Sequence, residues 1–296
     1  MYKFKHWIDV DKLDWYFVSK LDNIDFLLHQ YVDKLDWNVI SKYSKNIEFL
    51  NLHKDKINWD QLSLNENAMP ILKNNIDKIN WSFLSLNINA IHLLEQHINK
   101  INWANISSNI NAIHIIENNI DKINWSSLSL NTNAIHLLKK NIDRIDWKYL
   151  SLNKNATSLL INNIDNVNWR WVSSSLHHIE LLEQNIERID WEFILINPSA
   201  THIIKQNMHK IKNFRLLSCN INGIEIINNN PHLINWKLLS GNINAIELLK
   251  ENPELINWSE LCENPAAIDI IEKNLDKIDW VSISKNAAII EYTKLN

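Results

Sequence analysis

Glycine, proline and cysteine are scarce in this chain of 296 residues, and each scarcity excludes something. With two glycines and five prolines, most turns must be made by other residues, and the 47 asparagines are the natural candidates for turns and helix caps. The two cysteines, Cys219 and Cys262, are too few for a disulfide framework or a thiolate zinc site. Cysteine usage therefore fits a reducing compartment, and we predict a cytoplasmic protein.

Long apolar runs and an excess of positive charge are also missing. The formal net charge is −4 and the pI is about 6.3, so there is no general attraction to nucleic acid or anionic lipid. The first residues, MYKFKHWIDVDKLDW, lack the apolar core of a signal peptide, and no apolar run approaches the roughly 18 residues that span a membrane. We expect a folded protein with no membrane partner.

Tryptophan recurs at a fixed interval and defines the organisation of the chain. After one residue is gained within HKIKNF, Phe214 takes the tryptophan place and the interval resumes. The thirteen anchors share the consensus W-x-x-L-S-x-N-x-N-A-I-x-L-L-x-x-N-I-D-K-I-N, with a period of 22 residues. The tryptophan anchors are Trp15, Trp37, Trp59, Trp81, Trp103, Trp125, Trp147, Trp169, Trp191, Trp236, Trp258 and Trp280.

The apolar positions within each repeat follow helical spacing. They recur in steps of three and four, unlike the alternating strand of a leucine-rich repeat. Asn80 precedes its anchor as an N-cap, and Pro198 behind Asn197 is typical of a helix start. Pro253 behind Asn252 would break a continuing helix, so the second helix should end there. In the repeat at Trp81, the residues expected to be buried are Trp81, Leu84, Ala90, Ile91, Leu93, Leu94 and Ile98.

Two helices of this length are too weak to persist alone, so each repeat must stack on the next. The sequence therefore predicts an all-α fold, an α-solenoid in which about thirteen helix-turn-helix repeats form a right-handed superhelical stack. We expect one continuous domain: a capping region at residues 1–36, a repeat array at 37–279 and a C-terminal half-repeat cap at 280–296.

Residues at equal positions in successive repeats should form columns. The asparagines six places after the anchor and the serines four places after it are explained by caps and hydrogen bonds between repeats. The histidines eleven places after it alternate with acidic residues, as expected of a solvated position, and lie too far apart to share one metal ion. The first column includes Asn65, Asn87, Asn109 and Asn131, the second includes Ser63, Ser85, Ser107 and Ser129, and the third includes His92, His114, His136 and His202.

The sequence contains no phosphate-binding loop, no H-E-x-x-H motif and no nucleophile elbow. We therefore expect no enzymatic activity, no catalytic or metal-binding residues and no cofactor. The tryptophan anchors themselves are interpreted as core residues rather than as a stacking surface for ligands.

The most binding-like feature lies one and two places after the anchors in the second half of the chain. Cations there would form a column beside aromatic residues, which suits an acidic protein segment or stacked single-stranded RNA. Alternatively, the aromatic residues fill grooves between repeats and the cations aid solubility; the extra residue in HKIKNF could also kink the array nearby. The candidate partner-binding residues are Lys148, Tyr149, Arg170, Trp171, Phe193, Arg215 and Lys237.

Segments such as NINAIHLLEQHINKINW, from Asn87 to Trp103, resemble the short Asn/Trp helical repeats of giant DNA viruses of the mimivirus kind. The resemblance covers residues 11 to 290, although Asn-Ile or Asn-Thr often replaces Asn-Pro. It implies a viral interaction module in the host cytoplasm or the virion. We expect a non-enzymatic scaffold for protein–protein interaction that binds a host or virion component; the alternatives are single-stranded RNA binding and a self-assembling structural element.

Overall fold

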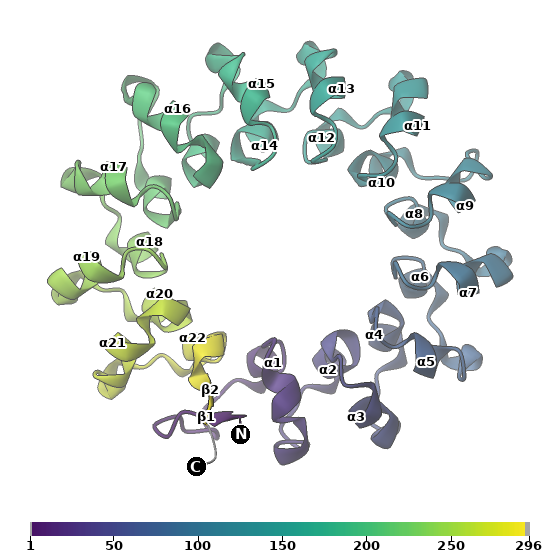
Figure 1. The fold of residues 1–296 in the computed structure, drawn as a ribbon, viewed down its shortest axis with the longest axis horizontal. Helices are drawn as coiled ribbons and strands as arrows, with labels where there is room; N and C mark the ends of the chain where they lie inside the picture. Colours follow the sequence, from purple (N-terminus) through teal and green to yellow (C-terminus); the bar gives the residue numbers. More distant parts are fainter. Residues whose placement is uncertain (1, 294–296) are drawn as a thin grey trace. The chain divides into compact units, whose positions relative to one another are not determined.

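The computed structural model describes residues 2–293 and is mostly helical, with repeated helices packing in neighbouring pairs (Figure 1). The predicted all-α repeat fold is confirmed. Contacts divide the chain into two compact units: a central unit, Trp37–Arg188, and a terminal unit, Met1–Asp36 with Ile189–Asn296.

The central unit contains seven pairs of helices. In each pair, the first helix begins at the anchor tryptophan and lies on the concave side of the unit, and the second lies on the convex side (Figure 1). The first helices are α2 (Trp37–Tyr43), α4 (Trp59–Leu64), α6 (Trp81–Leu84), α8 (Trp103–Ile106), α10 (Trp125–Leu130), α12 (Trp147–Leu150) and α14 (Trp169–Ser174). The second helices are α3 (Ile47–Leu52), α5 (Met69–Leu72), α7 (Ile91–Gln96), α9 (Ile113–Glu117), α11 (Ile135–Lys140), α13 (Thr157–Ile161) and α15 (Ile179–Glu183).

The terminal unit combines the two ends of the chain. Its α-helices are α1 (Trp15–Val18), α16 (Thr201–Gln206), α17 (Ile224–Asn228), α18 (Trp236–Ser240), α19 (Ile246–Glu251), α20 (Trp258–Glu263), α21 (Ile268–Glu272) and α22 (Trp280–Ile283). Its 3-10 turns include η1 (Ile24–Phe26), η2 (Leu28–Gln30), η8 (Phe193–Ile196), η9 (Pro198–Ala200), η10 (Met208–Lys210), η11 (Arg215–Cys219), η12 (Pro231–Leu233), η13 (Pro253–Leu255), η14 (Pro265–Ala267), η15 (Leu275–Lys277) and η16 (Ala287–Ile289).

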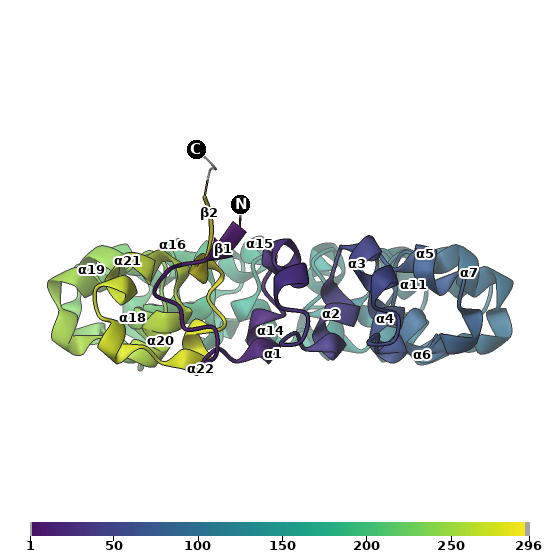
Figure 2. The same ribbon diagram turned by 90° about the horizontal axis from the view of Figure 1, so that it is seen from below.

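The only strands among the described residues join the two ends of the chain. Strand β1 (Tyr2–Phe4) pairs antiparallel with β2 (Ile290–Tyr292), with Tyr2 opposite Tyr292 and Phe4 opposite Ile290. The pair lies at one edge of the terminal unit (Figure 2). The two regions expected as separate caps thus contact each other, while residues 294–296 of the expected C-terminal cap lie outside the described residues.

The cap at Asn80 and the helix end at Asn252 are where the sequence predicts them, but Pro198 and Pro265 do not open the second α-helices. The Asn80 side chain accepts a hydrogen bond of 3.1 Å from the backbone N–H of Phe83, which confirms it as the N-cap of α6. Helix α19 ends at Glu251, immediately before Asn252, as predicted. Pro198, however, begins a 3-10 turn, and helix α16 starts only at Thr201.

A third element of the repeat was not predicted. A 3-10 turn follows the second helix and leads into the next anchor, because the I-D-K segment closes a single turn between the helix end and the next N-cap. In the central unit these turns are η3 (Ile76–Lys78), η4 (Ile98–Lys100), η5 (Ile142–Arg144), η6 (Ile164–Asn166) and η7 (Ile186–Arg188).

The core of the repeat at Trp81 is aliphatic. Leu84, Ala90, Leu93 and Leu94 are buried, as predicted, and Ile91 is half-buried. The prediction for Ile98 was wrong, because this residue opens the 3-10 turn η4 and is 43% exposed.

The anchor tryptophans are half-buried rather than enclosed in the core, so that interpretation was only partly right. One ring face is covered by a cation 19 residues further along: the Lys100 ammonium lies 4.8 Å from the centre of a Trp81 ring. This cation–π contact also explains why the I-D-K lysine recurs. The same contact joins Lys56 to Trp37, Lys78 to Trp59, Lys122 to Trp103, Arg144 to Trp125, Arg188 to Trp169, Lys210 to Trp191 and Lys277 to Trp258.

The asparagine column forms a buried hydrogen-bond ladder between repeats. The Asn131 Nδ2 donates to the carbonyl oxygens of Ser107 and Asn109 in the preceding repeat, at 3.1 and 3.0 Å, and its Oδ1 accepts from the N–H of Asn133. One side chain thereby satisfies three backbone groups, two of them in the buried residues Ser107 and Asn109, which confirms the structural interpretation. The rungs described in both units are made by Asn65, Asn87, Asn109, Asn131, Asn153, Asn220, Asn242, Asn264 and Asn286.

The serine column provides a second connection between repeats. The Ser85 hydroxyl donates to the Trp81 carbonyl at 2.8 Å and accepts from the backbone N–H of Asn102, the next N-cap, at 3.0 Å. The hydroxyl therefore links two successive anchors, as the structural interpretation predicted.

Candidate binding surface

Four of the seven candidate residues lie on adjacent first helices of the central unit. Lys148 and Tyr149 are on α12, and Arg170 and Trp171 are on α14, on the concave side of that unit (Figure 1). The Ser151 hydroxyl accepts from the Asn168 N–H at 3.0 Å and joins the end of α12 to the start of α14. Lys148, Tyr149 and Arg170 are exposed and Trp171 is half-buried.

The other three candidates belong to the terminal unit. Phe193 on η8 is half-buried, whereas Arg215 on η11 and Lys237 on α18 are exposed. Acidic residues interrupt this part of the column: Glu192 takes the cation place beside Phe193, and the Lys237 ammonium lies 3.9 Å from a carboxylate oxygen of Glu260. The cationic and aromatic character is therefore clearest on α12 and α14.

Most other repeats of the central unit use the position after the anchor differently. A short polar side chain there bonds to the N-cap of the next repeat: Asn102 Nδ2 donates to Ser82 Oγ at 3.0 Å, and Asn80 Nδ2 donates to Asp60 Oδ1 at 3.0 Å. Lys148 is too long for this link and carries its ammonium to within 5.8 Å of the Tyr149 ring centre. The change of residue type converts an internal link into a charged, aromatic surface.

Exposed aliphatic residues beside the ladder were missed by the sequence reasoning. They stand directly before or after the ladder position and are 37% to 50% exposed. The signal was the recurring S-x-N-x-N segment. Its first asparagine is fixed in the interior, so an aliphatic residue directly before or after that asparagine points elsewhere. These residues are Leu86, Ile110, Leu130, Leu152 and Leu176 in the central unit, and separately Ile196, Ile221 and Ile243 in the terminal unit.

A pocket of about 330 Å³ lies at the extra residue of HKIKNF in the terminal unit. Leu195 stands in the serine column here and cannot accept a hydrogen bond from the next repeat. The ladder nevertheless continues, because Asn220 Nδ2 donates to the carbonyls of Leu195 and Asn197 at 2.8 and 3.1 Å. The insertion is thus accommodated in the loop, where the pocket is lined by Trp191, Glu192, Lys210, Ile211, Lys212 and Asn213.

The histidine column is exposed, as predicted, and His114 and His136 pair with acidic residues of the preceding repeat. His114 Nε2 lies 2.6 Å from Glu95 Oε1, and His136 Nε2 lies 2.7 Å from Glu117 Oε1. Within residues 2–293, no group of three or more His, Cys, Asp or Glu residues is placed to hold a metal ion. These histidines connect neighbouring second helices.

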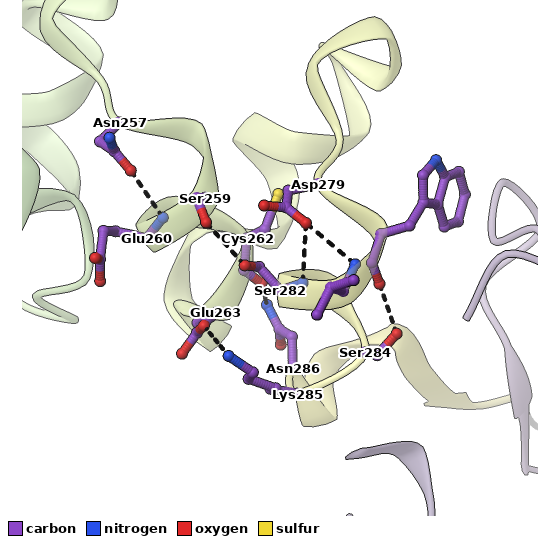
Figure 3. A network of polar contacts seen from close by, with 12 residues as sticks. Asn257, Ser259, Glu260, Cys262, Glu263, Asp279, Ser282, Ser284, Lys285 and Asn286 are labelled. Carbon is purple, nitrogen blue, oxygen red and sulfur yellow. Dashed lines mark hydrogen bonds and ion pairs between the residues drawn. The ribbon is translucent and has the colours of Figure 1, made fainter. Parts of the chain in front are cut away.

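Polar contacts around α20 and α22 also cap helices and connect neighbouring repeats (Figure 3). Burial works to raise the pKa of the Asp279 carboxyl, but hydrogen bonds from the Ser282 N–H, the Ser259 hydroxyl and the Val281 N–H outweigh it and lower that pKa. Asn286 Nδ2 donates to the Cys262 carbonyl at 2.9 Å. Each of these groups caps a helix or joins two repeats, so the arrangement stabilises the stack.

The fold and these surfaces define an all-α helical-repeat protein. The chain matches no protein-family model, no curated protein and no solved structure. No helix within the described residues has the length and apolar character needed to cross a membrane.

Proposed function

We propose that this protein is a non-enzymatic repeat scaffold that binds a partner protein through the surface formed by Lys148, Tyr149, Arg170 and Trp171. The observation that carries the proposal is the repetition of one chemistry on two adjacent helices, a cation followed by an aromatic residue on α12 and again on α14. Four of the five other repeats of the central unit carry a short polar side chain at the place of these cations, so the packing of that unit does not require a cation there.

The chemistry of this surface fits an acidic segment that also carries apolar side chains. Tyrosine, tryptophan and arginine are the residues most enriched where binding energy concentrates in protein interfaces. A half-buried ring such as Trp171 loses little conformational freedom when it is covered, and the neighbouring cations favour an oppositely charged partner. The resemblance to giant-virus repeats leads us to propose a host or virion component as the partner, with action in the host cytoplasm or the virion.

A binding titration tests the proposal. The probes are two fluorescent 20-residue peptides with the same leucines and phenylalanines, one rich in Asp and Glu and the other rich in Lys and Arg. We expect the acidic peptide alone to bind, and Trp171→Ala to weaken binding by about 10- to 100-fold, as expected for loss of an interface hot spot. The double variant Lys148→Glu with Arg170→Glu should abolish it.

A matched control reverses two charges on the convex side of the same unit. Lys139→Glu with Lys140→Glu on α11 makes the same change in net charge and should leave binding unchanged. Equal losses in both double variants, or equal binding of both peptides, would contradict the proposal.

Single-stranded RNA is the second candidate, because bases stack on aromatic rings beside cations. A 20-nucleotide oligouridine in the same titration distinguishes the two. Strongly salt-dependent RNA binding that is lost with Lys148→Glu, Arg170→Glu and Trp171→Ala, without acidic-peptide binding, would replace the protein-binding proposal.

A further inference from the structure

The N-terminal segment, residues 2–36, stacks on the repeat at Trp280 through the contacts that successive repeats use. The Asp14 N–H donates to the Ser284 hydroxyl at 2.8 Å, although 270 residues separate them. This is the bond that the Asn102 N–H makes to Ser85 in the middle of the array, at 3.0 Å. Residues 2–36 therefore occupy the place of a repeat that would follow the last one.

Two further contacts keep the same register. Asn23 Nδ2 donates to the Ala287 carbonyl at 3.1 Å, just as Asn89 Nδ2 donates to the Glu66 carbonyl at 2.9 Å between successive repeats. The second of these contacts is a cation–π pair between Lys12 and Trp280.

Lys12, three residues before its anchor, places its ammonium 5.2 Å from the centre of a Trp280 ring. Lys100, three residues before Trp103, occupies the same position over Trp81 at 4.8 Å. Three independent contacts thus identify the end of the repeat at Trp280 as a surface that accepts another repeat.

This junction differs from the internal ones in its interior. Leu21 stands at the ladder position, so the two buried hydrogen bonds of a rung are missing here. The strand pair β1–β2 closes the edge instead, with Lys5 Nζ 3.4 Å and Lys3 Nζ 3.6 Å from carboxylate oxygens of Glu291. The Tyr2 ring also stacks on Phe26, with centroids 3.9 Å apart.

We propose that this surface, defined by Trp280, Ser284, Ala287, Ile290 and Glu291, is a docking site for residues 2–36 of a second copy of this chain. The contacts are non-covalent, so any chain that presents the segment in the same register satisfies them. Covalent attachment gives the chain's own segment the advantage of a high effective concentration, of millimolar order for a flexible connection. Exchange between two copies requires opening of the junction at high protein concentration, as in domain swapping.

Two single-cysteine variants test the exchange. Tyr2 and Tyr292 are directly opposite in the strand pair, a placement within the range of a disulfide bond. One chain carries Tyr2→Cys and the other Tyr292→Cys, both with Cys219→Ser to remove the exposed native thiol. The two are mixed, opened in urea near the unfolding midpoint, returned to buffer and oxidised with diamide.

We expect a covalent heterodimer on a non-reducing gel, in a yield that rises with the protein concentration at which the chains were opened. A control chain carries Leu255→Cys on η13, an exposed position in an earlier repeat, in place of Tyr292→Cys. It should give at least about tenfold less heterodimer. Equal yields from the two mixtures, or no heterodimer at concentrations up to about the millimolar effective concentration, would overturn the proposal.

A locked chain gives a second readout. With Tyr2→Cys and Tyr292→Cys in one molecule, oxidation before opening should hold the segment in place, so that light scattering finds only monomers after the urea treatment. The same chain kept reduced should yield dimers. Dimers in the oxidised sample would show that association uses another surface and would overturn the proposal.

Discussion

Thr157 Oγ1 lies 2.9 Å from Nδ1 of His178. His178 occupies the position of the small alanine in the consensus, is fully buried, and has no hydrogen-bond partner for Nε2. In the same repeat, Ser175 replaces the ladder asparagine. The imidazole thus fills the interior where the regular packing is interrupted.

Acid should destabilise the protein through this histidine. Burial, with a smaller effect from the charge of His177, lowers the pKa of His178 to about 4. An unfolded histidine titrates near 6.5, so between these values the unfolded chain binds more protons and stability falls as the pH falls. The loss should approach about 3 kcal/mol below pH 4.

Urea midpoints at pH 7 and pH 4.5 measure this effect. His178→Ala should reduce the difference between the two midpoints, whereas His92→Ala, which removes an exposed imidazole, should not. The same pH dependence in wild type and His178→Ala would contradict the expectation.

Removal of one ladder rung should cost more than removal of a neighbouring exposed amide. Asn131→Ala leaves the carbonyls of Ser107 and Asn109 without this donor, and we expect a loss of about 3 kcal/mol in the free energy of unfolding. Asn133→Ala removes one exposed bond to the Ile110 carbonyl and should cost about 1 kcal/mol. Urea unfolding compares the two variants, and similar losses would argue against a special role for the ladder.

The two glycines should respond oppositely to alanine. A Cβ at Gly223 would lie 2.9 Å from Leu217 Cδ1 and 3.0 Å from the Leu217 carbonyl oxygen, so Gly223→Ala should lower stability by about 1–2 kcal/mol. At Gly241 the nearest atoms are 3.7 Å away and φ is −84°, so Gly241→Ala should raise stability by about 0.4–1 kcal/mol. Melting temperatures of the two variants on either side of the wild-type value would bear this out; a stabilised Gly223→Ala would refute it.

The two thiols should react at very different rates. Cys219 is exposed, whereas Cys262 is fully buried and burial raises the pKa of its thiol. Iodoacetamide should alkylate Cys219 in the folded protein, and Cys262 on the order of 10³-fold more slowly because it must wait for local opening. Mass spectrometry of timed samples checks this, and the difference should vanish in denaturant.

The sequence was most informative where a residue type has one well-defined effect on a helix, such as starting or ending it. Asn80 before an anchor predicted both the start of a helix and the capping bond, and Pro253 behind Asn252 predicted the end of another. The 3-10 turn at Ile98 was not predictable from periodicity, because a single turn has no period. For the same reason Ile98 was assigned to the core and proved to be exposed.

The surfaces were less predictable than the helices. From the sequence alone, a lysine in the I-D-K segment is expected to point into solvent. In the folded protein, the Lys100 ammonium lies over the ring of Trp81. Arg170 and Trp171 were recognisable as candidates because they depart from the consensus. Phe193 belongs to a different compact unit, and the repeat pattern does not predict this division because it is the same in both units. The extra residue in HKIKNF marked the position of an irregularity in the sequence. The pocket beside Trp191 was not predictable, because it depends on the path that the longer loop takes.

The bond from Asp14 to Ser284 has a consequence for how the chain can be connected. Stacking there depends on position within the 22-residue pattern and not on peptide linkage. Joining the residues after Tyr292 to those before Tyr2 by a short linker, and opening the backbone at another loop, would give a circular permutant with the same contacts at this junction. The contacts at this junction therefore do not determine which repeat comes first in the chain.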